Sequence, residues 1–203
     1  MSQPKLTLKK IFGHWGTIRL HRKWVKKYCA LAGIRWRGIK HDLSKYSPIE
    51  FWESARYWTG ESSPINACKN DQGWSKAWMH HKGHNSHHYE YWMDNFDKGG
   101  EALLMPMDDF VEQVCDFIAA GIAYSGGRDH FTFSSERAWW LQKREHCAMN
   151  SKNKMMLDII FSDLEYADNH LLSGCPTALL TSTPESLIKS GYLQEVWRAN
   201  AME

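Results

Sequence analysis

The helical spacing of the apolar side chains is the feature that most restricts the fold of this chain. Over residues 6–31, apolar and histidine side chains recur every three or four positions, while basic side chains occupy another face. This stripe consists of Ile11, His14, Ile18, His21, Val25 and Cys29. No segment of the sequence alternates apolar and polar residues convincingly with a period of two. The sequence therefore predicts an all-α protein, folded as a compact helical bundle.

Capping residues, glycines and prolines divide the rest of the chain. Ser47-Pro48-Ile49-Glu50 is a capping box with proline at the first helical position, so a helix is expected from there to about residue 58. Further helices are expected at about 74–81, from near 86, at 108–124, at 134–147 with Ser134 as the cap, at 151–172, and after Thr183-Pro184. Loops are expected at 33–38, 60–73 and 99–106.

The charge is unevenly distributed along the sequence. The net charge is only +2, yet residues 1–40 carry eleven Lys or Arg and no Asp or Glu, which leaves −9 for the remainder. A basic segment of this kind attracts phosphate groups, so a small phosphorylated substrate is expected, and nucleic acid is a candidate partner of the N-terminal helix. A solvated helix face is the alternative interpretation.

The cysteines indicate a reducing compartment. They are odd in number and none is spaced as CxxC, which argues against a disulfide framework or a zinc ribbon. They are Cys29, Cys68, Cys115, Cys147 and Cys175. No apolar core of a signal peptide lies near Met1, and the longest apolar run, 117–124, is too short to cross a bilayer. We therefore expect a cytoplasmic protein without a membrane partner.

Two groups of histidines point to metal chemistry. His41 and Asp42 are adjacent, and at a helix end both side chains can reach one cation, for which imidazole and carboxylate suit zinc, iron or manganese. A second group of five histidines falls within nine residues, at spacings that allow convergence on one side of helical segments. These are His80, His81, His84, His87 and His88. A solvent-facing polar turn would also fit, but the flanking aromatic residues favour a buried site.

Two further residues fit the same interpretation. Asp116 lies on a helix that becomes apolar on all sides, and a buried aspartate needs a cation or hydrogen-bond donors. A structural salt bridge would satisfy it equally. His21 lies on the apolar stripe of the first helix, where a lone histidine is more often a core residue than a ligand. Together with the other groups it is interpreted as a ligand, with His14 as its alternative.

The order His…His-Asp…Asp on separate helices resembles the HD-domain superfamily of metal-dependent phosphohydrolases. The histidines between the HD pair and the last Asp resemble its dinuclear branch. More specifically, the motifs HDLSKYSP at 41–48, AWMHHK at 77–82, NSHHYEYW at 85–92 and Cys115-Asp116 look like an uncharacterised family found in bacteria and their phages. The resemblance covers about residues 15–125. It implies an HD-domain-like bundle and its ligands but carries no settled activity.

These observations predict one or two divalent transition-metal ions, from among Mn, Fe, Zn and Co. The predicted ligands are His21, His41, Asp42 and Asp116, with His81 and His88 completing a second ion. His80 and His87 are the alternatives within their pairs. Lys45, one turn after Asp42, is expected to face the substrate and hold a phosphate or another anion. Glu90 is expected to orient a histidine or to move protons.

The predicted function is hydrolysis of a nucleotide or other phosphoester through metal-activated water. One alternative is an HD-type diiron oxygenase, because some proteins with this pattern use two irons to activate oxygen. The other is a non-enzymatic nucleic-acid or protein-binding module whose metal is structural. The length suits a single domain over 1–203, with the metal-binding core at 6–125 and C-terminal helices at 130–203 packed on it.

Overall fold

The computed structural model describes residues 4–94, 96–99, 102–172 and 183–201. Cys175 and two residues of the predicted loop 99–106, residues 100 and 101, lie outside these ranges. Within them the structure contains helices and no strand, so the predicted all-α class is confirmed. None of the described helices is long and apolar enough to cross a membrane.

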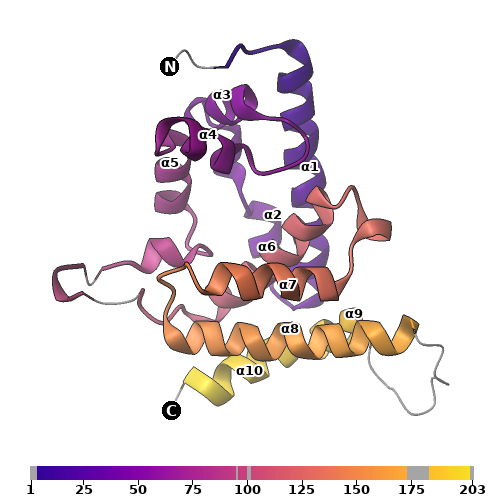
Figure 1. Cartoon of the computed structure of the whole chain (residues 1–203). Helices are drawn as coiled ribbons and strands as arrows, with labels where there is room; N and C mark the ends of the chain where they lie inside the picture. The colour runs from indigo at the N-terminus through magenta and orange to yellow at the C-terminus, as the bar shows by residue number, and fades with distance from the viewer. Residues whose placement is uncertain (1–3, 95, 100–101, 173–182, 202–203) are drawn as a thin grey trace.

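Ten α-helices make up the described chain (Figure 1). They are α1 (Leu8–Leu31), α2 (Arg35–Lys40), α3 (Pro48–Tyr57), α4 (Pro64–Gln72), α5 (Lys76–His84), α6 (Met107–Tyr124), α7 (Phe133–Arg144), α8 (Ser151–Leu172), α9 (Pro184–Lys189) and α10 (Tyr192–Ala201). Four short 3-10 helices, η1 (Leu43–Tyr46), η2 (Tyr89–Trp92), η3 (Phe96–Lys98) and η4 (Arg128–His130), lie between them.

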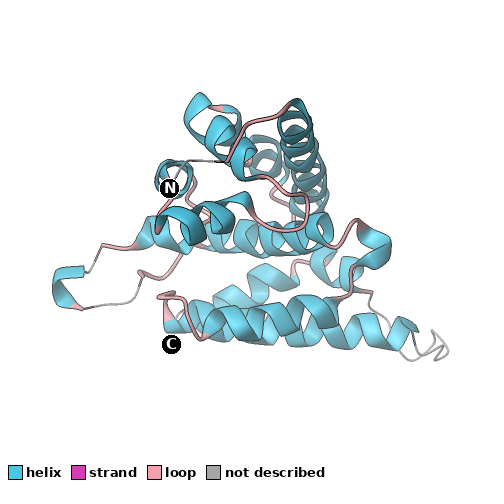
Figure 2. Cartoon of the chain, turned by 45° about the horizontal axis from the view of Figure 1, so that its top comes forward, coloured by secondary structure: helices cyan, strands magenta, loops and turns pink. Residues whose placement is uncertain are grey.

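The helices form two parts that meet at α6. Helix α1 packs on α2, α3 and α6, and α4 and α5 pack on α3 (Figure 1). Helices α7 and α8 lie side by side below them, and α9 and α10 pack on α8 (Figures 1 and 2). Every residue of α6 from Asp109 to Ala119 is buried. The sequence predicts this burial only beyond Asp116, where the helix becomes apolar on all sides, and burial of the polar side chains Asp109, Glu112 and Gln113 before it is a correction.

Side-chain caps explain where several helices begin. Thr7 accepts a hydrogen bond from the Lys10 backbone N–H at the start of α1. Ser47 does the same for the N–H of Glu50, with Pro48 at the first position of α3, as the capping box predicts. Helix α7 begins one residue before Ser134, and its cap is Thr132 rather than Ser134.

Two predicted loops contain helices. Helix α2 begins inside the predicted loop 33–38 and ends two residues beyond it. Its Gly38 packs so closely on Cys29 of α1 that a side chain there would collide with Cys29. Helix α4 lies within 60–73 and buries Pro64 and Cys68. Both are short, and α4 is mostly polar, so their apolar spacing is too weak to be recognised without the helices they pack on. The piece after Thr183 is two helices, α9 and α10.

One apolar core joins the two parts. It extends from the C-terminal half of α1 through α6 to α7, α8 and the last two helices. Its largest fully buried side chains include Tyr28, Phe110, Phe133, Trp140 and Phe161. Burial of these aromatic and aliphatic side chains holds α6 in the middle of the molecule and thereby fixes the position of Asp116.

Candidate metal centre

The first group of ligand atoms comes from α1, the turn after α2, and α6. His21 Nε2, His41 Nε2, Asp42 Oδ2 and Asp116 Oδ1 lie 3.0 to 3.4 Å from one another in the pairs that involve either histidine. Around a tetrahedral ion with bonds of about 2.0–2.1 Å, neighbouring ligand atoms are about 3.3 Å apart. The four buried side chains therefore already have the spacing that a transition-metal ion requires.

An unusual backbone turn brings the adjacent His41 and Asp42 to the same point. His41 ends α2, and Asp42 has φ 54°, making it the one non-glycine residue with a positive φ in the part of the chain that is described. The left-handed conformation costs a non-glycine residue free energy, and aspartate is among those that tolerate it. Arg22 supports the turn by donating to the carbonyl oxygens of Ile39 and His41, each at 2.9 Å.

A second group of ligand atoms meets at the other oxygen of Asp42. Asp42 Oδ1 lies 3.3 Å from His81 Nε2 and 3.5 Å from His87 Nε2, and His88 completes the group. Asp42 Oδ1 and all three Nε2 atoms are buried and make no hydrogen bond, whereas Asp42 Oδ2 is paired with Lys45. Unsatisfied buried acceptors are costly, and their convergence on one point is explained by a cation. Asp42 can therefore bridge two ions.

Two glutamates hold the imidazoles in place. His41 Nδ1 donates to Glu112 Oε1 at 2.8 Å, and His81 Nδ1 donates to Glu50 Oε2 at 2.7 Å. Each bond leaves the lone pair of the opposite nitrogen, Nε2, facing a ligand group, as carboxylates behind metal-binding histidines do. Arg37 also donates to Glu112 at 2.7 Å. Against the effect of burial, the hydrogen bond from His41 and the charges of His87 and Arg37 hold the pKa of Glu112 below its ordinary value. The hydrogen bond between His41 and Glu112 explains why these two residues lie close together beside His87, so this third group does not require an ion.

The electrostatics favour cation binding. Burial by itself would raise the pKa of Asp42 and of Asp116, but the neighbouring imidazoles, and Lys45 at Asp42, hold both well below the ordinary value. Burial lowers the pKa of His87 to about 4 and that of His88 well below its ordinary value. These two imidazoles are thus neutral at physiological pH, which is the form that binds metal.

A family model described as "Family of unknown function (DUF5662)" matches residues 10–163. The chain belongs to the DUF5662 family. The match contains every residue of both ligand groups and continues past the 15–125 expected from the motifs, through α7 and into α8. No HD-domain family model matches. No curated protein and no solved structure matches the chain.

Of the predicted ligands of this DUF5662 protein, six lie in the two groups: His21, His41, Asp42, His81, His88 and Asp116. His87, the predicted alternative to His88, lies in the second group beside it. His80 lies outside both groups and donates to Glu50 Oε1 at 2.6 Å, stacked on the exposed His84. Trp78 lies 5.0 Å from the His88 ring and helps to enclose the centre, whereas the flanking Trp74 and Tyr91 are exposed.

Three other candidate residues have distinct positions. Lys45 Nζ lies 2.5 Å from Asp42 Oδ2, and 31% of its side chain is exposed, so it borders the solvent side of the first group. His14 is buried near Lys45 and outside both ligand groups; burial lowers its pKa to about 4. Glu90 is not among the residues brought to the histidines; it lies beside Tyr89, and burial together with the charge of Glu90 raises the pKa of that phenol.

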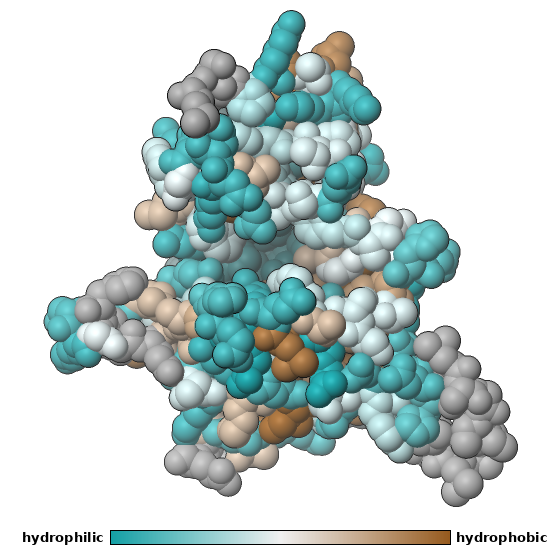
Figure 3. Space-filling view, in the orientation of Figure 1, coloured by the Kyte–Doolittle hydropathy of each residue, from teal (hydrophilic) through white to brown (hydrophobic). Residues whose placement is uncertain are grey.

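Glu50 and Glu112 were missed by the sequence analysis. Glu50 belongs to the capping box of α3, and Glu112 precedes Asp116 by one turn of α6. The spacing of one helical turn places Glu112 on the same side of α6 as Asp116, and this spacing could have indicated that Glu112 lies at the site. On the surface, Figure 3 shows a hollow above α7, between α5 and α2, which leads toward the helices that carry the ligands.

Proposed function

We propose that this DUF5662 protein is a metal-dependent phosphohydrolase that acts on a nucleotide or another phosphoester. The observation that carries the proposal is the position of Asp42, whose two oxygens face two ligand groups while Lys45 Nζ meets one of them at the solvent side. One or two divalent ions held there would activate water and neutralise charge on the phosphoryl group. The basic first forty residues support an anionic substrate.

Lys45 has the properties of a phosphate-binding residue. Burial of its inner part would lower its pKa, but Asp42 and Asp116 raise the pKa above the ordinary value, so the ammonium group stays charged. An ion bound to Asp42 would take over that charge balance and leave the Lys45 ammonium free to contact an anion. We therefore propose that Lys45 binds the phosphoryl group of the substrate.

Glu50 and His80 supply a route for protons. Glu50 accepts from both His80 and His81, and 22% of the His80 side chain is exposed. His80 is thus the imidazole of the cluster that can exchange protons with solvent while remaining bonded to the carboxylate behind a ligand. We propose this pair for the proton-transfer role that the sequence suggested for Glu90.

The test is an anaerobic assay of protein reconstituted with Mn²⁺, Co²⁺ or Zn²⁺ against nucleotides and simple phosphoesters. Phosphate release without oxygen is expected. Lys45→Ala should lower kcat/KM about 100-fold, the cost of removing one group that stabilises developing charge. Asp116→Asn should lose metal, and His84→Ala, on the exposed side of the cluster, is the matched control. Turnover that Lys45→Ala leaves unchanged would contradict the role of Lys45.

A diiron oxygenase is the second candidate, and the nitrogen-rich ligand set favours it. The two ligand groups contain five imidazoles, those of His21, His41, His81, His87 and His88, and imidazole suits iron as well as zinc. Oxygen uptake by the iron-loaded protein, dependent on an added substrate and without phosphate release, would favour this candidate over hydrolysis. A protein inactive in both assays would favour the binding-module alternative.

A further inference from the structure

The exposed face of α1 changes character along its length. Residues three or four positions apart share this face, and all are exposed. They are Leu8, Phe12, Trp15, Arg19, Lys23 and Lys26. The first three are apolar or aromatic, with Phe12 65% and Trp15 43% exposed, and the last three are basic. One side of a single helix thus presents an aromatic half followed by a cationic half.

A cavity of about 350 Å³ lies at the cationic half, between α1, α2 and η1. Its lining consists of Arg19, Arg22, Lys23, Lys26, Gly38, Ile39 and Tyr46. Four of these side chains are cationic and none is acidic. A concave surface with one sign of charge concentrates counter-ions of the other sign, so the cavity selects an anion.

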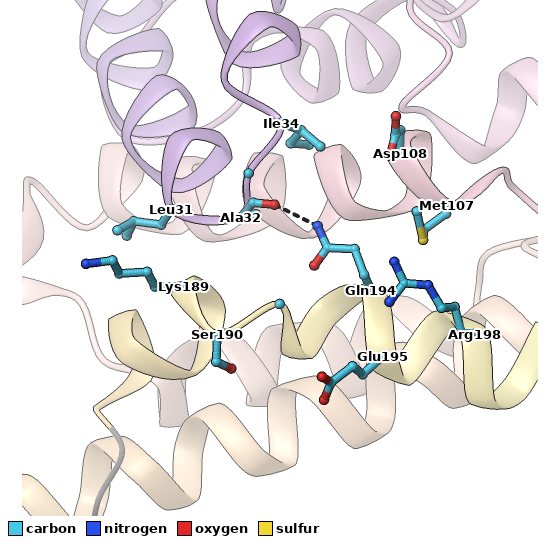
Figure 4. A pocket seen from close by; sticks show the side chains of 12 residues that line it. Leu31, Ala32, Ile34, Met107, Asp108, Lys189, Ser190, Gln194, Glu195 and Arg198 are labelled. Atoms are coloured by element: carbon cyan, nitrogen blue, oxygen red, sulfur yellow. Dashed lines mark hydrogen bonds between the residues drawn. The ribbon is translucent and has the colours of Figure 1, made fainter.

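A second cavity is lined by both cationic and acidic side chains, unlike the cationic cavity at α1. It has a volume of about 530 Å³ and lies between the end of α1, the start of α6 and the α9–α10 turn (Figure 4). Lys189 and Arg198 line it together with Asp108 and Glu195. Since both signs are present in equal number, this cavity has no comparable preference for a polyanion. The anion preference belongs to the α1 face.

The cationic cavity adjoins the metal centre through the backbone. Arg22, which lines the cavity, donates to the carbonyl oxygen of His41, whose imidazole belongs to the first ligand group. Tyr46 also lines the cavity and directly follows Lys45, which contacts Asp42. An anion held by the α1 cations would therefore lie beside residues 39–46, the segment that carries His41 and Asp42.

The aromatic half of α1 suits bases rather than further phosphates. The Arg19 guanidinium lies 4.7 Å from the centre of the Trp15 ring, so a cation and an exposed aromatic face form one platform. Exposed aromatic rings beside a basic groove are the arrangement on which single-stranded nucleic acids stack their bases. A helix that lies in a membrane surface separates apolar and basic residues onto two sides, whereas here they follow each other along the same side.

We infer that the exposed face of α1 binds single-stranded nucleic acid, with bases on Phe12 and Trp15 and phosphates in the cavity of Arg19, Arg22, Lys23 and Lys26. The strand would then present a phosphodiester to the metal centre. This second step rests on the proposed function, while the binding surface does not.

Binding is measured by fluorescence anisotropy of labelled oligothymidylate and oligouridylate with the full chain over a series of salt concentrations. Four phosphate contacts predict a slope of log K against log salt of about −3. Trp15→Ala should weaken binding about tenfold through lost stacking. The double variant Arg19→Ala/Lys26→Ala should flatten the slope by about 1.4, because two contacts are lost. Lys189→Ala, an exposed lysine on α9, is the matched control and should change neither value.

The outcomes separate the two proposals. Binding by Asp116→Asn with loss of oligonucleotide cleavage supports both. Binding without hydrolysis of any phosphoester by the metal-loaded protein keeps the surface and removes the proposed function. Hydrolysis of small phosphoesters with no strand binding overturns the inference and leaves the function standing. Equal affinity for a duplex, unchanged binding by both α1 variants, or stronger binding to vesicles containing phosphatidylserine would also overturn it.

Discussion

Helices α1 to α6 and helices α7 to α10 bury different kinds of side chain. Among the described residues, fourteen buried polar or charged side chains precede residue 125 and three follow it. The three are Glu136, Asn153 and Asp168. The later helices are therefore held mainly by apolar burial, whereas the earlier ones enclose a cluster of acids and imidazoles that must be compensated.

The few polar groups of the later helices are mostly satisfied within the protein. Asp168 accepts the Phe133 backbone N–H at 3.0 Å, and Asn153 accepts that of Met105 at 3.1 Å. The earlier helices instead leave Asp42 Oδ1 and three imidazole nitrogens without a hydrogen bond. The comparison implies that a bound ion stabilises one part of the molecule far more than the other.

Replacing Asp42 should have the largest effect. Asp42→Ala removes the side chain shared by both ligand groups, so metal content should fall to background and any hydrolase activity by more than about 100-fold. Elemental analysis of the purified variant and the phosphoester assay measure this. His84→Ala serves as the control. Retention of one ion per chain by Asp42→Ala would show that the two groups do not share a ligand.

A core substitution in the later helices should act on stability alone. Leu157 of α8 is fully buried, and Leu157→Ala should lower the free energy of unfolding by about 2–5 kcal/mol by leaving a cavity. Metal content of the folded protein should stay unchanged. Urea unfolding and elemental analysis test the two halves of this expectation. Loss of metal with the core variant would mean that the two parts are coupled more tightly than their chemistry suggests.

Removal of the metal ion should destabilise the earlier helices and leave the later helices nearly unchanged. At an ion concentration 100 times its dissociation constant, binding stabilises the folded state by about 2.7 kcal/mol, which a chelator would remove. Amide hydrogen exchange should then increase in α5 and residues 41–46, which carry ligands, and change little in α8. The chelator should have no effect on Asp42→Ala. An equal loss of exchange protection in α8 would contradict the expectation that the metal ion stabilises mainly the earlier helices.

The effect expected at Glu136, the buried acid of α7, is the smallest within any single pH unit. Burial and the charge of Asp116 raise its pKa from 4.5 to about 8. The folded state therefore binds this proton more tightly, so the stabilisation is complete below pH 4.5 and is lost as the pH rises through about 8. Between these values Glu136 should lower the free energy of unfolding by at most about 1.4 kcal/mol per pH unit.

Glu136→Gln isolates this contribution. Unfolding of both proteins across the pH range should give curves that separate as the pH rises, with the Gln variant becoming relatively more stable. A cation on Asp116 neutralises the charge that raises the Glu136 pKa, so metal loading should reduce the separation. Parallel curves for the two proteins would show that Glu136 is not protonated in the folded state.

The helices could be predicted from sequence where apolar spacing was strong. α1, α3, α6 and α8 were predicted to within about two residues, and α8 with both ends correct. α2 and α4 were predicted as loops because a helix of six or nine residues obtains most of its stability from the helices it packs on. The sequence pattern does not show which helices α2 and α4 pack on.

The ligand types could be predicted because buried acids and clustered imidazoles need compensation wherever they occur. The choice within His80/His81 required tertiary structure, since successive helical side chains point about 100° apart and only the packing of α5 on α3 decides which faces inward. His87 and His88 lie outside any helix, where helical spacing gives no rule, and both join the second group.

The sequence by itself determined the class of fold and the chemistry of the ligands, because helix periodicity and the burial cost of charge are local properties of residues. Only the tertiary structure decided that Asp42 adopts a left-handed turn and that its two oxygens face two ligand groups. It also brought Glu50 and Glu112 behind the imidazoles of His81 and His41. These contacts join residues 31 and 71 positions apart, and such pairs are set by how α3, α5 and α6 pack rather than by any local pattern.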